Sequence, residues 1–382
     1  MHVFVSAGEP SGDLHGSNLI KALRQAQPDL LCSGFGGEHM ESAGARLLYP
    51  MANLSVMWFP HVLKSVDTFL SLLKKADRFF RVQRPDALVM IDYPGFHWWL
   101  ARKARKHGIP VIYFVPPQLW AWAGWRVQKI RRFVDHVVCS LPFEPAWYRQ
   151  HGVTAHYFGH PYFDALARQT LDRQFLGRHD QQGDPIVAVL PGSRKQEIAM
   201  NFPSFVKAMR IIHACRPATR FLVASLNEDQ RKLAADHLRG HNLPVELHAG
   251  KTNEIIQAAD VCMSVSGSVG LELLHGGLPS VVAYRIPRHD AVLARLVMKT
   301  PYISLVNLLA GEELFPEFLS VGCRAEGIAE QILQWLDRPS LAQWVRAKLA
   351  ALRQRVAFPG ACRRTAEFIL EQTGREPVRR AA

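Results

Sequence analysis

The chain has 382 residues, of which 48% are hydrophobic and 21% are charged, and its formal net charge is +13 at pH 7. This length is more than one hydrophobic core usually organises, so two domains are expected, and the composition excludes a disordered or low-complexity protein. The positive charge favours an anionic partner, such as a nucleic acid, a membrane surface or a phosphorylated ligand, although a merely basic enzyme is the simpler alternative.

Four short apolar runs in the first part of the chain have the composition of buried strands. They cover residues 2–7, 86–91, 110–115 and 135–141, with helical patterns between them. Because the runs are continuous rather than alternating, they predict strands that are buried on both faces of a parallel sheet. The first domain is therefore expected to be an α/β domain over residues 1–166.

A polar stretch at residues 167–184 lacks strong periodicity and is interpreted as a linker. Five further apolar runs follow it, at residues 185–190, 220–226, 245–250, 259–267 and 279–285. They predict a second parallel α/β domain over residues 185–357, and the two sheets are expected to face each other across a cleft. A helix expected at about 358–374 can pack back on the first domain, and the tail after it is expected to be disordered.

The first apolar run ends in the turn GEPSGD, residues 8–13, and a helical pattern follows. A strand, a glycine-containing turn and a helix mark the edge of a parallel sheet at which α/β proteins hold ligands. The turn is not the G-x-G-x-x-G of a dinucleotide site, and its two carboxylates disfavour a phosphate. It therefore indicates a ligand site without identifying the ligand.

The second buried run continues into MIDYPGF, which places Asp92 directly after a predicted strand. A carboxylate at the carboxyl end of a strand can act as a general base. The alternative is a turn aspartate that bonds the local backbone, as aspartate does before Pro-Gly. From these residues alone, the alternative is slightly favoured.

In the second domain, the turn LPGSRKQEI at residues 190–198 delivers Ser193 and Arg194 after a predicted strand. Arginine suits a diphosphate because its planar guanidinium makes two charge-assisted hydrogen bonds. The alternative is an ordinary turn with an exposed arginine.

A second turn of this domain, SVSGSVGLELLHGG at residues 264–277, joins a strand to a helix. Ser266, Gly267 and Ser268 lie at the helix start, where free N–H groups can bind an anion, and Glu272 can bind ribose hydroxyls. A capped helix start with a favourable acidic residue is the alternative. Together with the turn at 190–198, the pattern favours a nucleotide diphosphate.

Two segments of the first domain carry much apolar surface. Residues 54–80 mix basic residues with apolar candidates for lipid contact, namely Met57, Trp58, Phe59, Val62, Leu63, Val66, Phe69 and Leu70. The mix fits a helix in a membrane interface, whereas an amphipathic core helix is the alternative. The three tryptophans of PPQLWAWAGW, residues 116–125, can line an acyl or sugar site, anchor at lipid headgroups or pack in the core.

Other classes are disfavoured. The six cysteines form no C-x-x-C and lie mostly in apolar runs, which indicates reduced thiols in a cytosolic protein. No apolar stretch is long enough for a membrane span, and no signal peptide precedes the first strand. His237 and His241 have no third ligand nearby, so no metal site is expected, and no nucleic-acid module is recognisable.

Eight motifs, in order from about residue 3 to residue 373, resemble those of the lipid-A-disaccharide synthases, which are inverting glycosyltransferases with the two-domain GT-B fold. They are SAGEPSGD (6–13), IDYPGF (91–96), WAW (120–122), LPFE (141–144), FGHP (158–161), LPGSRKQEI (190–198), SGSVGLE (266–272) and TPYISLVNLLAGEELFPEF (300–318). The resemblance implies transfer of 2,3-diacylglucosamine from UDP-2,3-diacylglucosamine to 2,3-diacylglucosamine 1-phosphate. The products are a β-1′,6-linked tetraacyl disaccharide 1-phosphate and UDP, in the lipid A and lipopolysaccharide biosynthesis of Gram-negative-type bacteria.

The resemblance also implies a location and partners. The enzyme is expected in the cytoplasm, as a peripheral protein on the inner face of the anionic cytoplasmic membrane, without metal, cofactor or nucleic acid, and its sequence is compatible with an oligomer. The acyl chains of both substrates call for lipid-facing surface near residues 54–80. In this interpretation, the acidic turn belongs to the acceptor side, where Glu9, Ser11 and Asp13 are expected to bond sugar hydroxyls and amides.

Several roles come from the same resemblance. Asp92 resembles the catalytic base of the family, and Arg194 resembles the arginine that faces the UDP diphosphate. Glu272 matches the glutamate expected at the donor ribose. Asn307 and Glu313 lie in the stretch NLLAGEE, which is expected close to the donor.

This chain departs from the family pattern at four positions. The family usually has Asp and Asn in IDxPDFN, where this chain has Gly95 and His97. Glu312 replaces an arginine of NLLAGRE, and Gly270 replaces a hydroxyl residue of SGTxTLE. Chemistry is expected to be retained, with a changed donor affinity or acyl preference. Two alternatives stay open: another GT-B enzyme with a different lipid acceptor or a sugar-nucleotide epimerase, and a lipid A precursor-binding protein without turnover.

Overall fold

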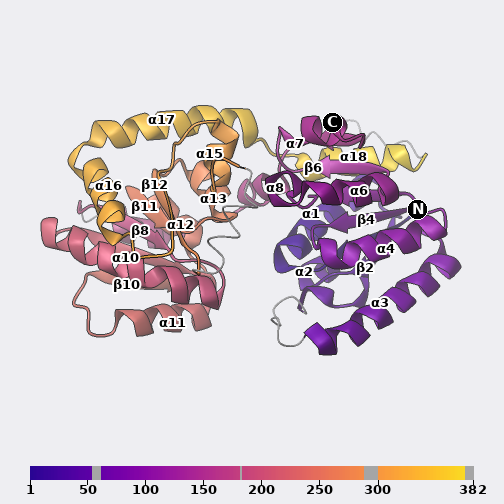
Figure 1. Ribbon diagram of the computed structural model, residues 1–382, viewed down its shortest axis with the longest axis horizontal. Helices are drawn as coiled ribbons and strands as arrows, with labels where there is room; N and C mark the ends of the chain where they lie inside the picture. The colour runs from indigo at the N-terminus through magenta and orange to yellow at the C-terminus, as the bar shows by residue number, and fades with distance from the viewer. Residues whose placement is uncertain (54–61, 181–182, 288–299, 375–382) are drawn as a thin grey trace. The chain divides into compact units, whose positions relative to one another are not determined.

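The computed structural model of the chain describes residues 1–53, 62–180, 183–287 and 300–374 (Figure 1). The chain divides into two compact units. The first comprises Met1–Ala167 together with Phe358–Ala382, and the second comprises Arg168–Ala357. Each unit contains one parallel sheet with helices packed against it, which confirms the predicted α/β class.

The first unit is built on a seven-stranded parallel sheet with the order β3-β2-β1-β4-β5-β6-β7. Its strands are β1 (His2–Ala7), β2 (Leu31–Phe35), β3 (Arg46–Tyr49), β4 (Ala87–Ile91), β5 (Val111–Phe114), β6 (His136–Cys139) and β7 (Ala155–Tyr157). The apolar runs predict β1, β4, β5 and β6, which are buried apart from a half-buried first residue in β1 and β6. They do not predict β2, β3 and β7, because β2 contains polar and glycine residues and the two edge strands are short and half-exposed.

Two helix layers cover this sheet. The helices are α1 (Pro10–Ala26), α2 (Glu38–Ser42), α3 (Val62–Gln83), α4 (Pro94–Lys106), α5 (Leu119–Trp122), α6 (Val127–Phe133), α7 (Glu144–Gln150), α8 (Pro161–Leu166) and α18 (Ala361–Gln372), with short 3₁₀ helices η1 (Met51–Asn53) and η3 (Gly124–Arg126). Val3 and Val5 lie in a core with α1 and α18, whereas Phe4 lies in a core with α3 and α4. Because side chains alternate along a strand, these are the two faces of the sheet.

The C-terminal helix α18 is attached to the first unit by a buried carboxylate. Asp164 accepts hydrogen bonds from the backbone N–H groups of Gly360, Ala361 (3.2 Å) and Cys362 (2.7 Å) at the start of α18. The guanidinium of Arg364 donates two hydrogen bonds to the carbonyl of Phe158, at 3.0 and 2.8 Å. The helix packs along α1, although more than 300 residues separate them.

The second unit contains a six-stranded parallel sheet with the order β10-β9-β8-β11-β12-β13. Its strands are β8 (Ile186–Leu190), β9 (Arg220–Ser225), β10 (Val245–Ala249), β11 (Val261–Ser264), β12 (Ser280–Arg285) and β13 (Glu317–Ser320). Its helices are α9 (Arg173–Asp180), α10 (Lys195–Cys215), α11 (Glu228–Leu238), α12 (Thr252–Ala258), α13 (Val269–Gly276), α15 (Leu305–Ala310), α16 (Ala325–Asp337) and α17 (Pro339–Val356). The apolar runs predict five of these strands, and the polar edge strand β13 is the one they do not predict.

The stretch 167–184, which the sequence indicates as a linker, contains helix α9 within the second unit. Asp172, just before α9, accepts a hydrogen bond from Lys251 at 2.8 Å and donates from its backbone N–H to Glu254 at 3.2 Å. Phe175 is buried beneath the helix. The buried rings of Phe175 and His179, together with polar contacts, hold α9 in place, and such contacts leave little hydrophobic periodicity in the sequence.

The segment proposed for lipid contact is described in part. Met57, Trp58 and Phe59 lie outside the described residues, as do the side chains of Val62, Leu63 and Val66. Within α3, Phe69 packs against the rings of Tyr93 and Phe96, at centroid distances of 6.4 and 5.7 Å, whereas Leu70 is 51% exposed. Among the helices that the structure describes, none has the length and apolar character required to cross a bilayer.

Candidate active site

Both sheets have a topological switch point, where the chain reverses the direction in which it adds strands. In the first unit this point lies between β1 and β4, and in the second it lies between β8 and β11. Ligands of open α/β sheets bind outside the carboxyl ends of the strands at such points. The turns singled out in the sequence follow these four strands, so the fold gathers them in two pairs.

In the first unit, the turns after β1 and β4 lie directly against each other. A Cβ atom on Gly8 would lie 2.2 Å from the ring of Tyr93, so only glycine lets the two turns approach this closely. Glu9 is the half-buried residue that precedes α1, and Ser11 is exposed in its first turn. Glu9 and Ser11 therefore lie beside the turn that carries Asp92.

Asp13 has a different role from the one expected. Its side chain is 3% exposed, and Oδ1 accepts hydrogen bonds from the backbone N–H groups of Gly37 (2.7 Å) and Met40 (3.1 Å). Oδ2 accepts a third from the N–H of His39 at 3.0 Å. A buried carboxylate with three backbone donors fixes the start of α2, so Asp13 stabilises the scaffold beside the switch point.

The backbone at Asp92 is left-handed. Asp92 has φ +47° and Tyr93 has φ +50°, and Val115 after the adjacent strand β5 has φ +52°. Non-glycine residues in this conformation cost of order 1–3 kcal/mol each and persist where neighbouring groups impose them. The Asp92 N–H donates to the Val115 carbonyl at 3.2 Å, so the two strained turns hold each other. The half-buried Asp92 side chain is thus fixed at the mouth of β4.

The Asp92 carbonyl accepts two side-chain hydrogen bonds. One comes from the hydroxyl of Tyr113 on β5 at 2.8 Å, and the other from Nδ1 of His97 on α4 at 2.5 Å. The other ring nitrogen of His97 lies 2.9 Å from the hydroxyl of Ser6 on β1. Burial disfavours the charged ring and lowers the pKa of His97 to about 4. Sequence reasoning treated His97 as a departure from a family pattern and missed this contact set.

In the second unit, the turn after β8 exposes Ser193 and Arg194 at the start of α10. The Glu197 carboxylate accepts hydrogen bonds from the backbone N–H groups of Ser193 (3.0 Å) and Arg194 (3.2 Å). It also pairs with the Arg194 guanidinium at 3.1 Å, while the Arg194 side chain stays 70% exposed. Glu197 thus occupies the helix start and leaves most of the guanidinium accessible. Its position three residues after Arg194 is the sequence signal for such a cap.

The turn after β11 lies next to this one, because the Val265 N–H donates to the Leu190 carbonyl at 3.1 Å. Gly267 and Ser268 are exposed at the start of α13, with no atom within 4 Å of a Cβ placed on Gly267. Ser266 donates to the Ile303 carbonyl at 2.6 Å, which orients the turn. Glu272 follows, half-buried, in the first turn of α13.

Asn307 and Glu313 lie in different environments. Asn307 is fully buried, and its Oδ1 accepts from the N–H groups of Leu314 and Phe315, both at 2.9 Å. Its Nδ2 donates to Glu317 at 2.8 Å and to the Phe315 carbonyl at 2.7 Å. Asn307 therefore braces the loop before β13, with each of these polar atoms bonded within the protein. Glu313 is exposed in that loop.

Two of the sequence motifs of the first unit meet at Glu144. This carboxyl group is fully buried and accepts hydrogen bonds from Trp120 Nε1 (2.9 Å) and from the N–H groups of Ser140 (3.0 Å) and Leu141 (2.9 Å). Burial raises the pKa of Glu144 to about 7. The first tryptophan of WAW is thus a structural partner of the LPFE carboxylate.

The other tryptophans of this region face solvent. Trp122 and Trp125 are 48% and 68% exposed, and Trp99 on α4 is 57% exposed. The Arg126 guanidinium lies over both Trp122 and Trp125, at 4.8 and 5.1 Å from their rings. Exposed tryptophans stacked with arginine are typical of surfaces that meet lipid headgroups.

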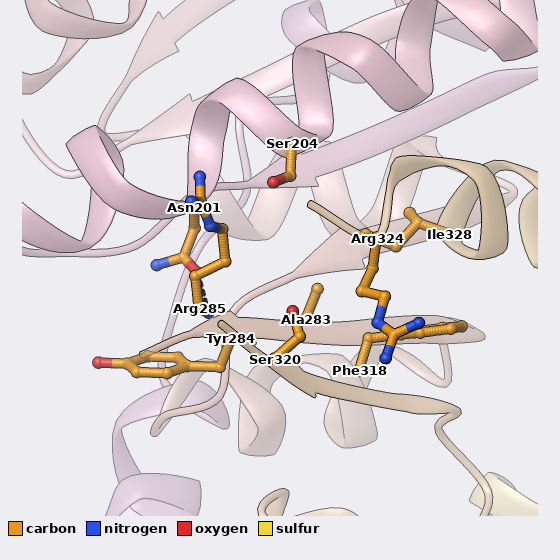
Figure 2. Close-up of a pocket in the computed structure, with 9 residues that line it drawn as sticks. All are labelled: Asn201, Ser204, Ala283, Tyr284, Arg285, Phe318, Ser320, Arg324 and Ile328. Carbon is orange, nitrogen blue, oxygen red and sulfur yellow. Dashed lines mark hydrogen bonds between the residues drawn. The ribbon is translucent and has the colours of Figure 1, made fainter. Parts of the chain in front are cut away.

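A small recess opens beside β12 in the second unit (Figure 2). It is lined by Asn201, Ser204, Ala283, Tyr284, Arg285, Phe318, Ser320, Arg324 and Ile328. Ser204 Oγ and Arg285 Nε are buried there without a hydrogen-bond partner among the described residues. The recess has room for about one water molecule, which can satisfy such groups.

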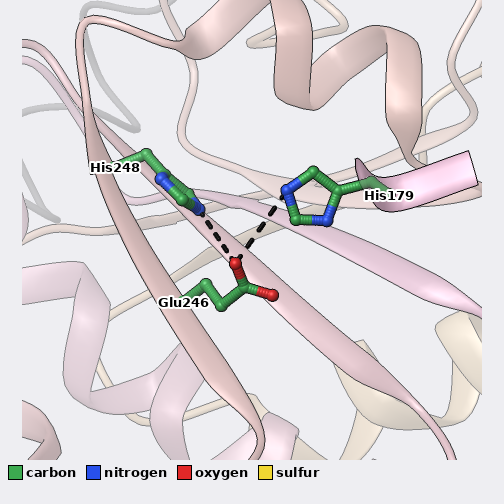
Figure 3. A group of neighbouring side chains, drawn as sticks. All are labelled: His179, Glu246 and His248. Carbon is green, nitrogen blue, oxygen red and sulfur yellow. Dashed lines mark ion pairs between the residues drawn. The ribbon is translucent and has the colours of Figure 1, made fainter. Parts of the chain in front are cut away.

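Three side chains at the β10 edge of the second sheet could in principle hold a metal ion (Figure 3). The ligand atoms of His179, Glu246 and His248 lie within 4.8 Å of one another. However, the Arg220 guanidinium donates to Glu246 at 2.7 Å and to Nδ1 of His179 at 3.0 Å. This cation already neutralises the carboxylate and fixes the hydrogen of His179 on the nitrogen that faces Glu246. The group is therefore an ion-pair network between α9, β9 and β10.

Comparisons with known proteins agree with the sequence motifs. The profile of a family described as lipid-A-disaccharide synthetase matches residues 3–365. A lipid-A-disaccharide synthase of Trichlorobacter lovleyi is 34% identical over 372 residues, which is 96% of each chain. One of Myxococcus xanthus is 35% identical over 371 residues, which is 97% of each chain.

Solved structures of low sequence identity share the fold. A Staphylococcus aureus MnaA–UDP structure has a TM-score of 0.69 at 11% identity over 100% of both chains. A UDP-GlcNAc 2-epimerase from Neisseria meningitidis, bound to UDP-GlcNAc, has a TM-score of 0.67 at 15% identity, over 97% of this chain and 100% of that one. MurG of Acinetobacter baumannii has a TM-score of 0.60 at 14% identity, over 97% and 99% of the two chains. With a GT-B fold and a family match over nearly its whole length, the chain belongs to the lipid-A-disaccharide synthase family of glycosyltransferases.

Proposed function

We propose that this chain transfers 2,3-diacylglucosamine from UDP-2,3-diacylglucosamine to 2,3-diacylglucosamine 1-phosphate. The products are the β-1′,6-linked tetraacyl disaccharide 1-phosphate and UDP. The observation that carries this proposal is the pair of switch points: carboxylates and a strained turn at one, an exposed arginine and a helix start at the other. The family supports the reaction class, and the specific substrates are part of the proposal.

In the proposed reaction, the oxygen of the acceptor 6-hydroxyl bonds to the anomeric carbon of the donor. The bond from that carbon to the UDP oxygen breaks, and attack from the opposite face inverts the configuration. Asp92 takes the hydroxyl proton as the general base. The negative charge that develops on UDP is stabilised by Arg194 and by the N–H groups at the start of α13.

The donor is proposed to bind at the second switch point. Besides Arg194, its contacts are Ser193, Ser266, Gly267, Ser268, Glu272 and Glu313, while Asn307 braces the adjoining loop. Fold neighbours whose structures contain UDP or UDP-GlcNAc support a uridine nucleotide as the ligand. On the acceptor side, Glu9 and Ser11 are proposed to bond the sugar, and Asp13 is left out because its oxygens bind backbone N–H groups.

The protein is further proposed to bind peripherally to an anionic membrane surface, on the inner face of the cytoplasmic membrane. Both substrates carry acyl chains, which partition into lipid. Support comes from the exposed side chains of Leu70, Trp99, Trp122 and Trp125, which all belong to the first unit, and from the net charge of +13. Tryptophan favours the interface, and Arg126 adds positive charge beside two of these rings.

The direct test is an assay of the full chain in detergent micelles with both substrates and a chelator. Mass spectrometry should detect the tetraacyl disaccharide 1-phosphate and UDP from the wild type, and little of either from Asp92→Asn. Absence of product from the wild type, with UDP still bound, would replace this proposal by a different acceptor or by a binding protein. Absence of both product and UDP binding would overturn the assignment of the donor site.

A further inference from the structure

His97 links three elements around the proposed base. It lies on α4, is fully buried, and bonds the hydroxyl of Ser6 on β1 and the backbone carbonyl of Asp92. Its ring also lies edge-on to Tyr113, at a centroid distance of 6.1 Å, and Tyr113 donates to the same carbonyl. The strained peptide that follows Asp92 is therefore held from α4 and from β5.

The hydrogen-bond partners define the tautomer of His97. A carbonyl oxygen can only accept, so Nδ1 of His97 carries the hydrogen that is donated to Asp92 at 2.5 Å. Nε2 is then the acceptor, and the Ser6 hydroxyl donates to it at 2.9 Å. Ser6 is fully buried next to the end of β1, so this relay of hydrogen bonds, from Ser6 through His97 to the Asp92 carbonyl, begins on a rigid strand. The chain of donors runs from Ser6 through the imidazole to the Asp92 carbonyl.

This relay controls the direction of the Asp92 side chain. The carbonyl orientation fixes the peptide plane between Asp92 and Tyr93, and both residues are left-handed. Without a donor on the α4 side, that plane can relax toward ordinary backbone geometry, because left-handed conformations of non-glycine residues are unfavourable. A rotation of the plane moves the carboxylate relative to the strands that carry the rest of the turn.

We propose that His97 is a positioning residue of the transferase: its Nδ1–H holds the left-handed turn that aims the Asp92 carboxylate. The inference rests on the proposed role of Asp92 as the base. It goes beyond that role, because it assigns a function to a residue that departs from the family pattern. His97 itself does not transfer the proton.

The test compares three substitutions that differ in which ring nitrogen they replace. In His97→Asn, the amide N–H lies near the position of Nδ1 and can still donate to Asp92. In His97→Gln, the amide lies near the position of Nε2 and reaches Ser6 instead, and His97→Leu keeps neither bond. We expect kcat to fall by about 10- to 100-fold in His97→Leu and His97→Gln, with KM unchanged, because a misplaced base loses effective concentration. His97→Asn should stay within about threefold of the wild type, because the donor to the carbonyl remains.

Controls separate positioning from stability. His179→Leu removes another buried histidine in the other unit and should leave kcat unchanged. Melting temperatures identify any variant that fails to fold, and nitrogen NMR of labelled His97 in the wild type reads the tautomer independently of activity. Equal kcat in His97→Asn and His97→Leu, or an Nε2–H tautomer, would overturn the inference. If Asp92→Asn keeps full activity, the assignment of Asp92 as the base is wrong. The NMR result then still decides whether His97 Nδ1–H donates to the Asp92 carbonyl.

Discussion

In the first unit, the turns after β1 and β4 present Glu9 and Asp92, and in the second unit the corresponding turns present Arg194 and the start of α13. The two sheets have the same kind of switch point, yet the first presents the carboxylates of Glu9 and Asp92, whereas the second presents a guanidinium that pairs with Glu197. The first site is preformed, with consecutive left-handed residues held by hydrogen bonds from His97 and Tyr113 to the Asp92 carbonyl. The second is open, and the Arg194 side chain is 70% exposed.

In the proposed function, one topology thus serves two chemical tasks. A general base must be aimed before the substrate arrives, because its contribution depends on geometry. An anion-binding group can complete its contacts with the ligand, since charge attracts over a longer range than hydrogen bonding. Substitutions at the two switch points should therefore have separable effects on kcat and on UDP binding.

The largest effect is expected for Asp92→Asn. Loss of the proposed general base should lower kcat by about 10²- to 10⁴-fold, while UDP affinity stays unchanged because the diphosphate is assigned to the other unit. Steady-state kinetics and calorimetric titration with UDP measure the two quantities. A parallel loss of UDP affinity would mean that Asp92 also serves the donor.

Arg194→Ala should produce the opposite pattern. Removing a charge-assisted partner of the diphosphate should weaken UDP binding and lower kcat/KM for the donor by about 10- to 100-fold. Arg231→Ala is the matched control, because Arg231 is another arginine of the second unit that pairs with a glutamate three residues away. If Arg194→Ala and Arg231→Ala bind UDP with equal affinity, the assignment of Arg194 to the donor site is wrong.

Asp13→Asn should affect stability more than chemistry. One amide cannot accept all three of the backbone hydrogen bonds now made to this buried carboxylate, so the free energy of unfolding should fall by about 1–3 kcal/mol. Urea unfolding measures this change, and KM for the acceptor should remain that of the wild type. A raised KM for the acceptor with an unchanged free energy of unfolding would instead indicate that Asp13 contacts the acceptor.

Buried histidines should make the first unit sensitive to acid. Burial lowers the pKa of His15 and His97 to about 4 and that of His160 to about 3, compared with 6.5 for an ordinary histidine. Because the unfolded chain binds more protons in this window, stability is present above pH 6.5 and is lost as pH falls toward 4. Glu144, with its pKa raised to about 7, acts in the opposite direction, since its protonated form is favoured in the fold.

The variant His97→Asn isolates one of these groups. Its free energy of unfolding should fall less steeply between pH 6.5 and 5 than that of the wild type, by about 1 kcal/mol per pH unit on average. Urea unfolding of both proteins at several pH values gives the slopes. Identical slopes would mean that His97 does not titrate differently in the folded and unfolded chains.

The smallest effect is expected at the membrane surface. Replacing Trp122 and Trp125 by alanine should weaken binding to vesicles with anionic lipid by about three- to tenfold, because each ring contributes modestly at an interface. Trp344→Ala is the control, since Trp344 is 54% exposed in the second unit. Cosedimentation at low and high salt measures binding. An equal loss of vesicle binding in Trp344→Ala would contradict the assignment of Trp122 and Trp125 to the membrane-binding surface.

The candidate residues chosen from turns lie in different environments, for a physical reason. The sequence shows that a polar residue follows a buried strand, but it does not show which backbone N–H groups come near it. Asp13 and Asn307 carry the right chemistry for sugar contacts. However, the Asp13 carboxylate accepts from N–H groups more than 20 positions along the chain, and the Asn307 amide bonds a nearby loop. His97 and Glu197 gained roles only when those partners were visible.

The sequence by itself determined the α/β class, the two parallel sheets and the family, because continuous apolar runs and ordered motifs are local properties. It also placed Asp92 and Arg194 at strand ends. Only the tertiary structure decided that Asp92 is left-handed and that Ser6, His97 and Tyr113 are brought together around it. These contacts join residues up to 91 positions apart, and no local pattern encodes the hydrogen-bond partners that the fold supplies.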